Sequence, residues 1–98
     1  MTFVDSHCHL DDPQFDADRE AVIERARAAG VSAMLSVGTG NGPPDLAAGI
    51  RVAEAHAGIY ATVGVHPHDA RKATAETWRE IERLLVHPKV VALGEIGL

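Results

Sequence analysis

Residues 2–9, Thr-Phe-Val-Asp-Ser-His-Cys-His, form the stretch around which the rest of the chain is organised. Residues 2–4 are β-formers and predict a short strand. Two histidines follow at a spacing of two, and alternate residues of an extended chain point to the same side. His7 and His9 can therefore direct both imidazoles at one metal ion, a ligand pair that suits zinc, iron, nickel or copper.

Two later stretches end in groups of the same chemical kind. Residues 90–95, Val-Val-Ala-Leu-Gly-Glu, are an apolar run that ends in Glu95, and residues 62–68, Thr-Val-Gly-Val-His-Pro-His, end in His66 and His68. Every candidate group thus follows a predicted strand, and in α/β folds sites are built at the carboxyl edge of the sheet. The sequence predicts one site at that edge.

Composition limits the class of protein. The 98 residues make one small domain or part of a larger one, and the net charge of −5 argues against a basic nucleic-acid surface. A phosphate substrate remains compatible with that charge because bound cations can supply positive charge locally. The single cysteine allows no internal disulfide, which fits a reducing compartment, and no apolar run approaches the roughly 20 residues that span a bilayer. We therefore expect a cytoplasmic protein with no membrane partner.

Strand and helix patterns alternate along the whole chain. The expected strands are residues 2–4, 31–37, 59–65 and 89–94, and the expected helices begin at the N-cap Asp16, at Pro43 and at the N-cap Thr74. Such alternation predicts an α/β fold: a parallel four-stranded sheet in chain order, with three crossover helices on one side. In the third helix, the spacing of Trp78, Ile81 and Leu85 predicts the buried stripe.

Two neighbours of the histidines have more than one interpretation. Asp5 shares their side in a regular strand, so it is either an acceptor that orients a ligand imidazole or a satisfied acid inside the fold. Cys8 points the opposite way and is better interpreted as a small buried hydrophobic residue than as a thiolate ligand.

Three motifs in this order resemble the TatD family of metal-dependent deoxyribonucleases: residues 7–9 (His-Cys-His), residues 64–68 (Gly-Val-His-Pro-His) and residues 94–98 (Gly-Glu-Ile-Gly-Leu). The resemblance implies a TIM (β/α)8 barrel with two divalent metal ions per complete site; zinc, magnesium and manganese are all plausible. It implies that His7, His9 and Glu95 bind metal and that Glu95 bridges the two ions. The family's further ligands come from later strands and would lie beyond Leu98, so residues 1–98 are expected to be the N-terminal half of such a barrel.

The resemblance implies a metal-dependent hydrolase of phosphodiester bonds, most simply a deoxyribonuclease acting on DNA. His66 and Glu95 are the candidate catalytic residues; His66 can serve as a general acid, as a phosphate contact or as a hydrogen-bonded strand-end residue.

Two alternatives stay open: another His-x-His barrel hydrolase acting on amides or phosphomonoesters, and a non-catalytic half-barrel that binds metal or a partner. An isolated half is expected to associate through its open sheet edges and to hydrolyse DNA far more slowly than a full-length relative.

Overall fold

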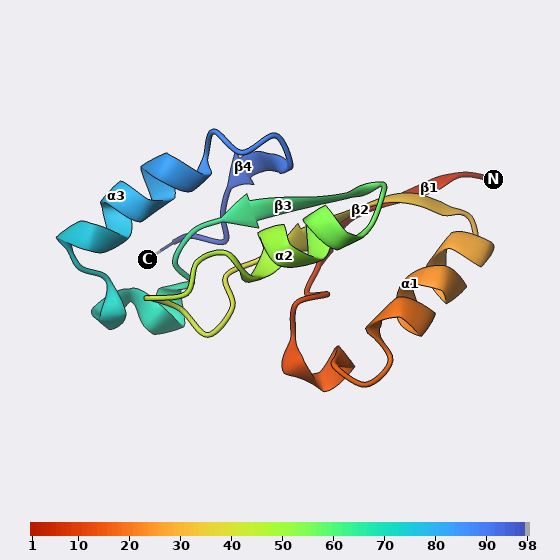
Figure 1. Ribbon diagram of the computed structural model, residues 1–98, viewed down its shortest axis with the longest axis horizontal. Helices are drawn as coiled ribbons and strands as arrows, with labels where there is room; N and C mark the ends of the chain where they lie inside the picture. The colour runs from red at the N-terminus through yellow and green to blue at the C-terminus, as the bar shows by residue number, and fades with distance from the viewer. Residues whose placement is uncertain (98) are drawn as a thin grey trace.

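The computed structural model describes residues 1–97 of the chain. Four parallel strands form one sheet in chain order: β1 (Phe3–Cys8), β2 (Val31–Val37), β3 (Ile59–Val63) and β4 (Val90–Leu93). Successive strands are connected through the helices α1 (Arg19–Ala28), α2 (Ala48–Ala55) and α3 (Ala75–Leu84) (Figure 1). This is the arrangement of half of a (β/α)8 barrel, and it confirms the predicted fold class.

The helices cover one face of the sheet. Apolar residues of all three helices and of β2 and β3 form a single buried cluster, in which Ile23, Ile59 and Val63 are completely inaccessible. Burial of this shared core explains why the crossovers lie on the same side of the sheet. Within residues 1–97, no helix has the length and apolar character needed to cross a membrane.

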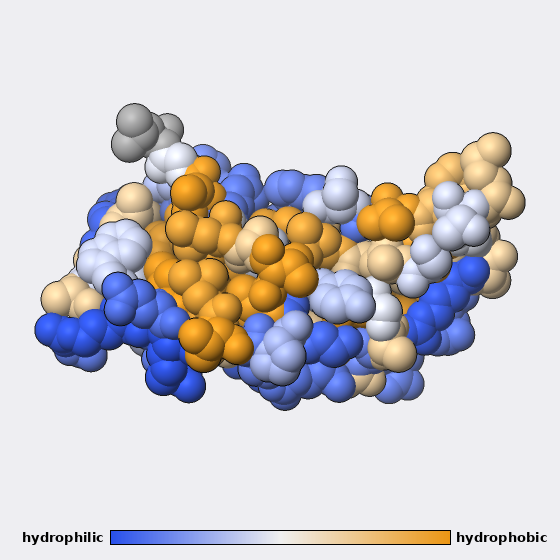
Figure 2. Space-filling model, turned by 90° about the horizontal axis from the view of Figure 1, so that it is seen from above, coloured by the Kyte–Doolittle hydropathy of each residue, from blue (hydrophilic) through white to orange (hydrophobic). Residues whose placement is uncertain are grey.

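The opposite face of the sheet is open. Val4, Leu35, Tyr60 and Val91 contribute to an apolar hollow of about 240 Å³, and the Val4 and Val91 side chains remain more than half exposed. Further exposed apolar residues lie on the side that carries α3 and β4, where Figure 2 shows a continuous hydrophobic patch. In a closed barrel the sheet face opposite the helices is the packed interior, so the exposure of Val4 and Val91 on that face is the main departure from an ordinary globular core.

β1 is longer and less regular than predicted. It extends from Phe3 to Cys8, so His7 lies inside the strand rather than after it. Asp5 pairs with Met34 and Cys8 pairs with Ser36, so three steps along β1 match two along β2. This irregularity interrupts the regular pairing of β1 with β2 between Asp5 and Cys8, the part of the strand that contains His7.

α1 and α2 begin later than the sequence patterns predicted. α1 starts after Asp18 rather than after Asp16, because Pro13–Phe15 form a short 3₁₀ helix (η1) and Arg19 pairs with the Asp16 carboxylate. α2 starts at Ala48 rather than at Pro43, because the Asp45 carboxylate accepts the Ala47 N–H and closes a local turn first.

α3 starts where predicted but presents a different face. Thr74 is its N-cap and its N–H donates to Oγ1 of Thr77, at 2.9 Å. This bond holds Thr77 on the core side, where Ile81 and Leu84 are also buried. Successive helical residues are about 100° apart, so Trp78 points outward and is 55% exposed. The prediction that Trp78 belongs to the core is therefore wrong.

Candidate metal centre

His7 and His9 converge at the carboxyl end of β1. They flank Cys8, and their ring centroids lie 5.1 Å apart with the ring planes at 74° to each other. Both side chains are exposed, so neither imidazole is committed to the core. The two-residue spacing thus brings the pair together as expected, although His7 lies in the irregular part of the strand and His9 immediately follows its last residue.

The protonation pattern of the His9 ring follows from its hydrogen bond. Nδ1 of His9 lies 3.1 Å from the carbonyl oxygen of Val37, at the end of β2. Because a carbonyl oxygen only accepts, we assign the proton to Nδ1, which leaves the lone pair of Nε2 available. A neutral imidazole oriented in this way by a backbone carbonyl is the usual form of a metal-ligating histidine.

Asp5 supports the main chain of the site. Its Oδ1 accepts the backbone N–H of His7 at 3.1 Å. This contact fixes the backbone from which the His7 side chain projects, and the two interpretations of Asp5, as an acceptor for a ligand imidazole or as a satisfied acid inside the fold, stay predictions.

Glu95 follows β4, the strand at the opposite edge of the sheet from β1. The preceding residue, Gly94, donates its N–H to the carbonyl oxygen of Val63 at 2.8 Å, which carries the chain alongside β3. The two carboxylate oxygens face different histidines: Oε2 lies 3.7 Å from Nε2 of His7, and Oε1 lies 3.4 Å from Nε2 of His66. Glu95 therefore lies between the β1 histidines and the end of β3.

The side chains of His7, His9 and Glu95 offer nitrogen and oxygen atoms of the types that bind divalent ions. The distances between these atoms are close to those that binding a single ion requires. One ligand atom from each residue lies within 4.8 Å of the others. Two atoms that each bind one ion at about 2.1 Å are at most about 4.2 Å apart, so the widest separation has to close by several tenths of an ångström. Exposed side chains can make that adjustment by small rotations. Two imidazoles and a carboxylate are a common ligand set for zinc and other transition metals.

His66 has a defined orientation beside this group. Its Nδ1 accepts the backbone N–H of His68 at 3.0 Å, at the start of the 3₁₀ helix η2 (Pro67–Lys72). The neutral ring therefore carries its proton on Nε2, the nitrogen that faces Glu95. A ring that presents N–H to the centre is better suited to donate a hydrogen bond than to bind a metal ion. His68 lies against His66, with ring centroids 4.6 Å apart.

Comparison with known proteins identifies the family. The family described as "TatD related DNase" matches residues 4–98. The chain belongs to this family. Among curated TatD relatives, the "3'-5' ssDNA/RNA exonuclease TatD" of Enterobacter lignolyticus is 46% identical over 90 residues, which are 92% of this chain and 34% of the relative.

A second curated relative and a solved structure agree with this placement. The "uncharacterized metal-dependent hydrolase YabD" of Bacillus subtilis is 43% identical over 94 residues, covering 96% of this chain and 36% of YabD. The crystal structure of YJJV, a TatD homolog from Escherichia coli K12, matches with a TM-score of 0.85 and 36% identity over 98% of this chain and 37% of YJJV. The chain thus spans about a third of the length of the curated relatives that it matches.

Cys8 takes the orientation predicted for it in this TatD-family chain. Its side chain packs against the core and its Sγ lies 3.4 Å from the carbonyl oxygen of Leu35. Burial, together with the negative charges of Asp5 and Asp11, raises the pKa of the Cys8 thiol to about 11. The thiol thus stays protonated near neutral pH and is poorly suited to be a metal ligand.

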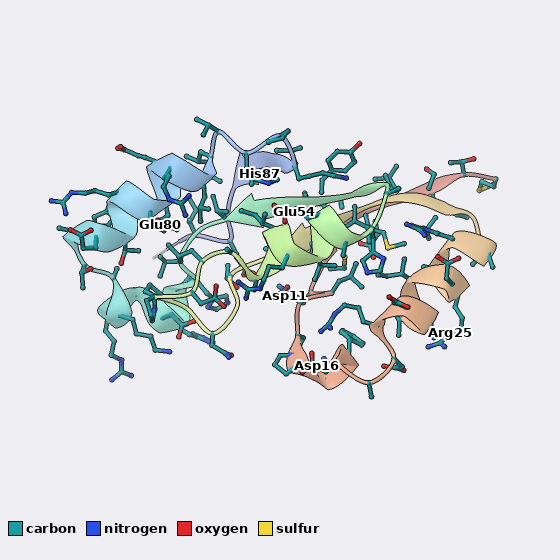
Figure 3. The ribbon with its side chains drawn as sticks, viewed as in Figure 1. Asp11, Asp16, Arg25, Glu54, Glu80 and His87 are labelled. Atoms are coloured by element: carbon teal, nitrogen blue, oxygen red, sulfur yellow. The ribbon has the colours of Figure 1, made fainter. Side chains whose placement is uncertain are left out.

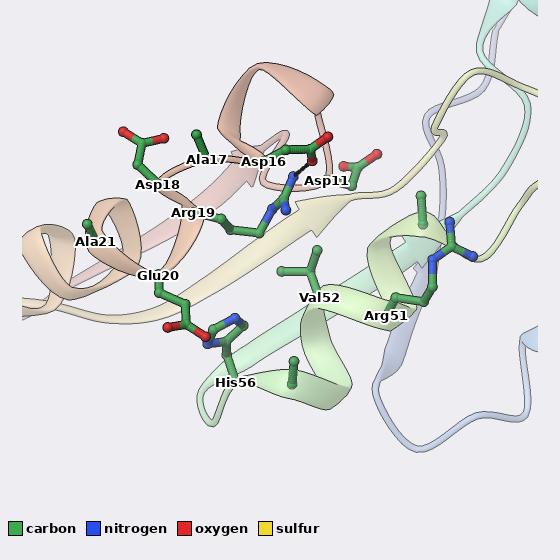
Figure 4. A pocket seen from close by; sticks show the side chains of 12 residues that line it. Asp11, Asp16, Ala17, Asp18, Arg19, Glu20, Ala21, Arg51, Val52 and His56 are labelled. Carbon is green, nitrogen blue, oxygen red and sulfur yellow. Dashed lines mark hydrogen bonds and ion pairs between the residues drawn. The ribbon is translucent and has the colours of Figure 1, made fainter.

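The other two histidines lie away from the centre. His87 has its Nε2 2.7 Å from the Glu54 carboxylate and accepts the Lys89 N–H at Nδ1, so it joins α2 to the turn before β4 (Figure 3). His56 lies in a groove of about 820 Å³ between α1 and α2, with Asp16 and Arg19 also on its walls (Figure 4). This groove is on the helical side and contains none of the residues proposed for the site.

The main-chain partners of the site could not be predicted from the sequence. The Val37 carbonyl orients His9, and the end of β3 holds the segment before Glu95. Neither contact has a signal in residue type, because any residue can offer a backbone carbonyl or N–H. Only the pairing of the strands shows which backbone groups reach the site.

Proposed function

We propose that this chain carries the N-terminal part of a TatD-type nuclease centre, which hydrolyses phosphodiester bonds of DNA or RNA with the help of two divalent ions per complete site. The observation that supports it most directly is the convergence of His7, His9 and Glu95 at the carboxyl edge of a TatD-family sheet. Curated relatives that carry the name of a single-strand DNA and RNA exonuclease support the substrate class.

His7, His9 and Glu95 are the residues proposed to hold metal. Zinc, magnesium and manganese are the candidate ions; the two imidazoles favour zinc, while magnesium prefers oxygen ligands. The two oxygens of the Glu95 carboxylate point in different directions, which suits it to bridge two ions. Divalent ions bound here supply Lewis-acid polarisation of a phosphate and a water of lowered pKa.

His66 is the proposed catalytic partner of Glu95. Its Nε2–H faces the carboxylate from the end of β3, and the backbone of His68 holds the opposite nitrogen. His66 can thus donate a hydrogen bond from Nε2–H to a phosphate oxygen held at the centre. The chain's negative charge is compatible with this substrate only if cations occupy the site first.

Three ligands hold two ions weakly, and an open sheet does not exclude water from a site. We therefore expect the 98-residue chain to cleave DNA far more slowly than a full-length TatD relative. We also expect it to associate through the exposed edges of β1 and β4 and through the apolar hollow between them. A cytoplasmic location, consistent with the single free Cys8, belongs to the same proposal.

The test uses single-stranded DNA and RNA labelled at the 5' end, which report shortening from the 3' end. The 98-residue chain and a polypeptide extended to the length of the relatives are assayed with zinc, magnesium, manganese and a chelator. We expect metal-dependent cleavage that is rapid only in the extended polypeptide. Cleavage unaffected by the chelator would contradict the metal centre, and metal binding without cleavage of nucleic acid by the extended polypeptide would favour an amide or phosphomonoester substrate or a non-catalytic role.

Association is measured separately by analytical ultracentrifugation of the 98-residue chain over a range of concentrations. A monomer at every concentration would contradict the proposed association, and a turnover comparable with that of a full-length relative in such a monomeric preparation would contradict the expected loss of activity.

A further inference from the structure

We infer that Thr62 is a positioning residue for the metal centre, which holds the segment before Glu95 against β3. Thr62 lies in β3 and is 4% exposed. Its Oγ1 donates a hydrogen bond of 2.6 Å to the carbonyl oxygen of Gly94, the residue immediately before Glu95. The inference rests on the proposed function, because it treats Glu95 as a metal ligand.

The main chain of Gly94 is tied to β3 at both of its polar groups. Its N–H donates to the carbonyl oxygen of Val63, and its carbonyl oxygen accepts from Thr62. Regular pairing between β3 and β4 ends at Leu93, so the strand ladder itself does not reach Glu95. The hydroxyl of Thr62 extends the connection between the strands by one residue, to the point where the ligand side chain begins.

The position of Thr62 in the sheet connects both sides of the centre. Thr62 pairs with Val37 of β2, the residue whose carbonyl oxygen lies 3.1 Å from Nδ1 of His9. The same residue of β3 thus adjoins the residue that orients His9 and the one that precedes Glu95. A shift of this part of β3 would change the separation of the two ligands.

Thr62 is a polar residue at a buried position of β3, so the presence of its hydroxyl there has to be accounted for. Burying a hydroxyl costs free energy unless it is hydrogen-bonded, and valine has nearly the same shape without that cost. Tyr60, two residues earlier on the same strand, remains 39% exposed. Thr62 differs from it in being buried, and the hydroxyl of Thr62 satisfies its donor by bonding the carbonyl oxygen of Gly94.

The first experiment measures Zn²⁺ affinity of the 98-residue chain by isothermal titration calorimetry. Thr62→Val is expected to weaken binding about tenfold, the lower end of the range for losing a partner outside the ligand set. Thr62→Ser keeps the hydroxyl and is expected to restore most of the affinity. Thr77→Val is the matched control, because Thr77 is also buried and also bonds the backbone through its hydroxyl, but in α3 and away from the centre.

The variants also separate positioning from a general loss of stability. Thr77→Val should lower the thermal unfolding temperature while leaving Zn²⁺ affinity unchanged. In a Glu95→Ala background, Thr62→Val should cost no further affinity, because the residue through which it acts is gone. Equal affinity of Thr62→Val and the parent, or an equal loss in the Glu95→Ala background, would overturn the inference.

A metal-free measurement keeps this test distinct from that of the proposed function. Amide hydrogen exchange of Gly94 should be faster in Thr62→Val than in the parent and should return to the parent rate in Thr62→Ser. A parent chain that binds no Zn²⁺ would contradict the proposed function, whereas Gly94 exchange unaffected by Thr62→Val would overturn the role of Thr62 whether or not metal binds.

Discussion

His7 and His9 reach the candidate metal centre from a single strand, whereas Glu95 reaches it from the far edge of the sheet. The histidines lie two residues apart at the end of β1, so the geometry of an extended chain is enough to bring their ring centroids to 5.1 Å from each other. Glu95 is separated from them by β2 and β3, and it lies 3.7 Å from His7 only because the sheet curves and β3 holds the end of β4.

The positions of the histidines and of Glu95 therefore depend on the sequence in different ways. The histidine side of the centre depends on local residues and is sensitive mainly to loss of the ligands themselves. The glutamate side depends on contacts between strands, so residues that bind no metal can still decide whether Glu95 is in place. Four experiments test this contrast, in decreasing order of expected effect.

Replacing His9 by alanine removes a ligand from the local side of the centre. We expect Zn²⁺ affinity to fall by at least about a hundredfold, since losing a ligand costs more than losing one of its outer partners. Isothermal titration calorimetry provides the measurement, with Cys8→Ala as the control, because Cys8 points to the core and should leave affinity unchanged. A His9→Ala variant that binds as tightly as the parent, or a Cys8→Ala variant that loses binding, would show that the site is misassigned.

The reactivity of Cys8 tests whether β1 keeps this orientation. The raised pKa of the thiol, about 11 against an ordinary value of 9.0, predicts about a hundredfold less thiolate at pH 8. Alkylation of the metal-free folded chain by iodoacetamide, followed by mass spectrometry, should be slower by that factor than alkylation in urea. The unfolded chain loses this proton at lower pH than the folded chain, so the contribution of Cys8 to stability is present below pH 9 and declines between about pH 9 and 11. Equal alkylation rates would mean that Cys8 is not buried.

Replacing Gly64 by alanine acts on the long-range side. A Cβ added at Gly64 would lie 2.9 Å from both the carbonyl carbon and the carbonyl oxygen of Gly94, so the end of β4 has to move. We expect Zn²⁺ affinity to fall about tenfold, as for loss of a partner outside the ligand set. The same substitution in a Glu95→Ala background serves as the control and should have no effect on the remaining affinity. Unchanged affinity of the single variant would mean that Glu95 does not depend on the contact between β3 and β4.

Replacing Asp5 by alanine is expected to have the smallest effect. Among residues 1–97 the carboxylate accepts the backbone N–H of His7, and an exposed hydrogen bond of this kind contributes about 1 kcal/mol, or about fivefold in affinity. Asp5→Asn keeps an acceptor oxygen and should bind Zn²⁺ like the parent. An Asp5→Ala effect as large as that of His9→Ala would mean that Asp5 itself binds metal.

Much of the fold was predictable because its signals are local. The alternation of apolar strands with helical stripes predicted the parallel order of the sheet, and the Thr74 cap placed the start of α3 correctly. The starts of α1 and α2 were not predictable in the same way, because the competing contacts of Arg19 and Asp45 form only once the loops are folded. The prediction for Trp78 failed for a related reason. The sequence of α3 allows a buried face that contains Trp78 or one that contains Thr77, and the folded structure buries the face with Thr77.

For the candidate site, the sequence by itself determined which side chains have suitable chemistry and on which edge of the sheet they gather. Parallel strands end on one side, so a histidine or glutamate that follows each strand has to lie at that edge. Only the tertiary structure decided how those groups face one another: that Val37 orients His9, that His66 presents Nε2 to Glu95, and that Thr62 reaches the carbonyl of Gly94. The physical reason is that these contacts join different strands, and sequence spacing does not specify the distance between strands that pair only in the folded sheet.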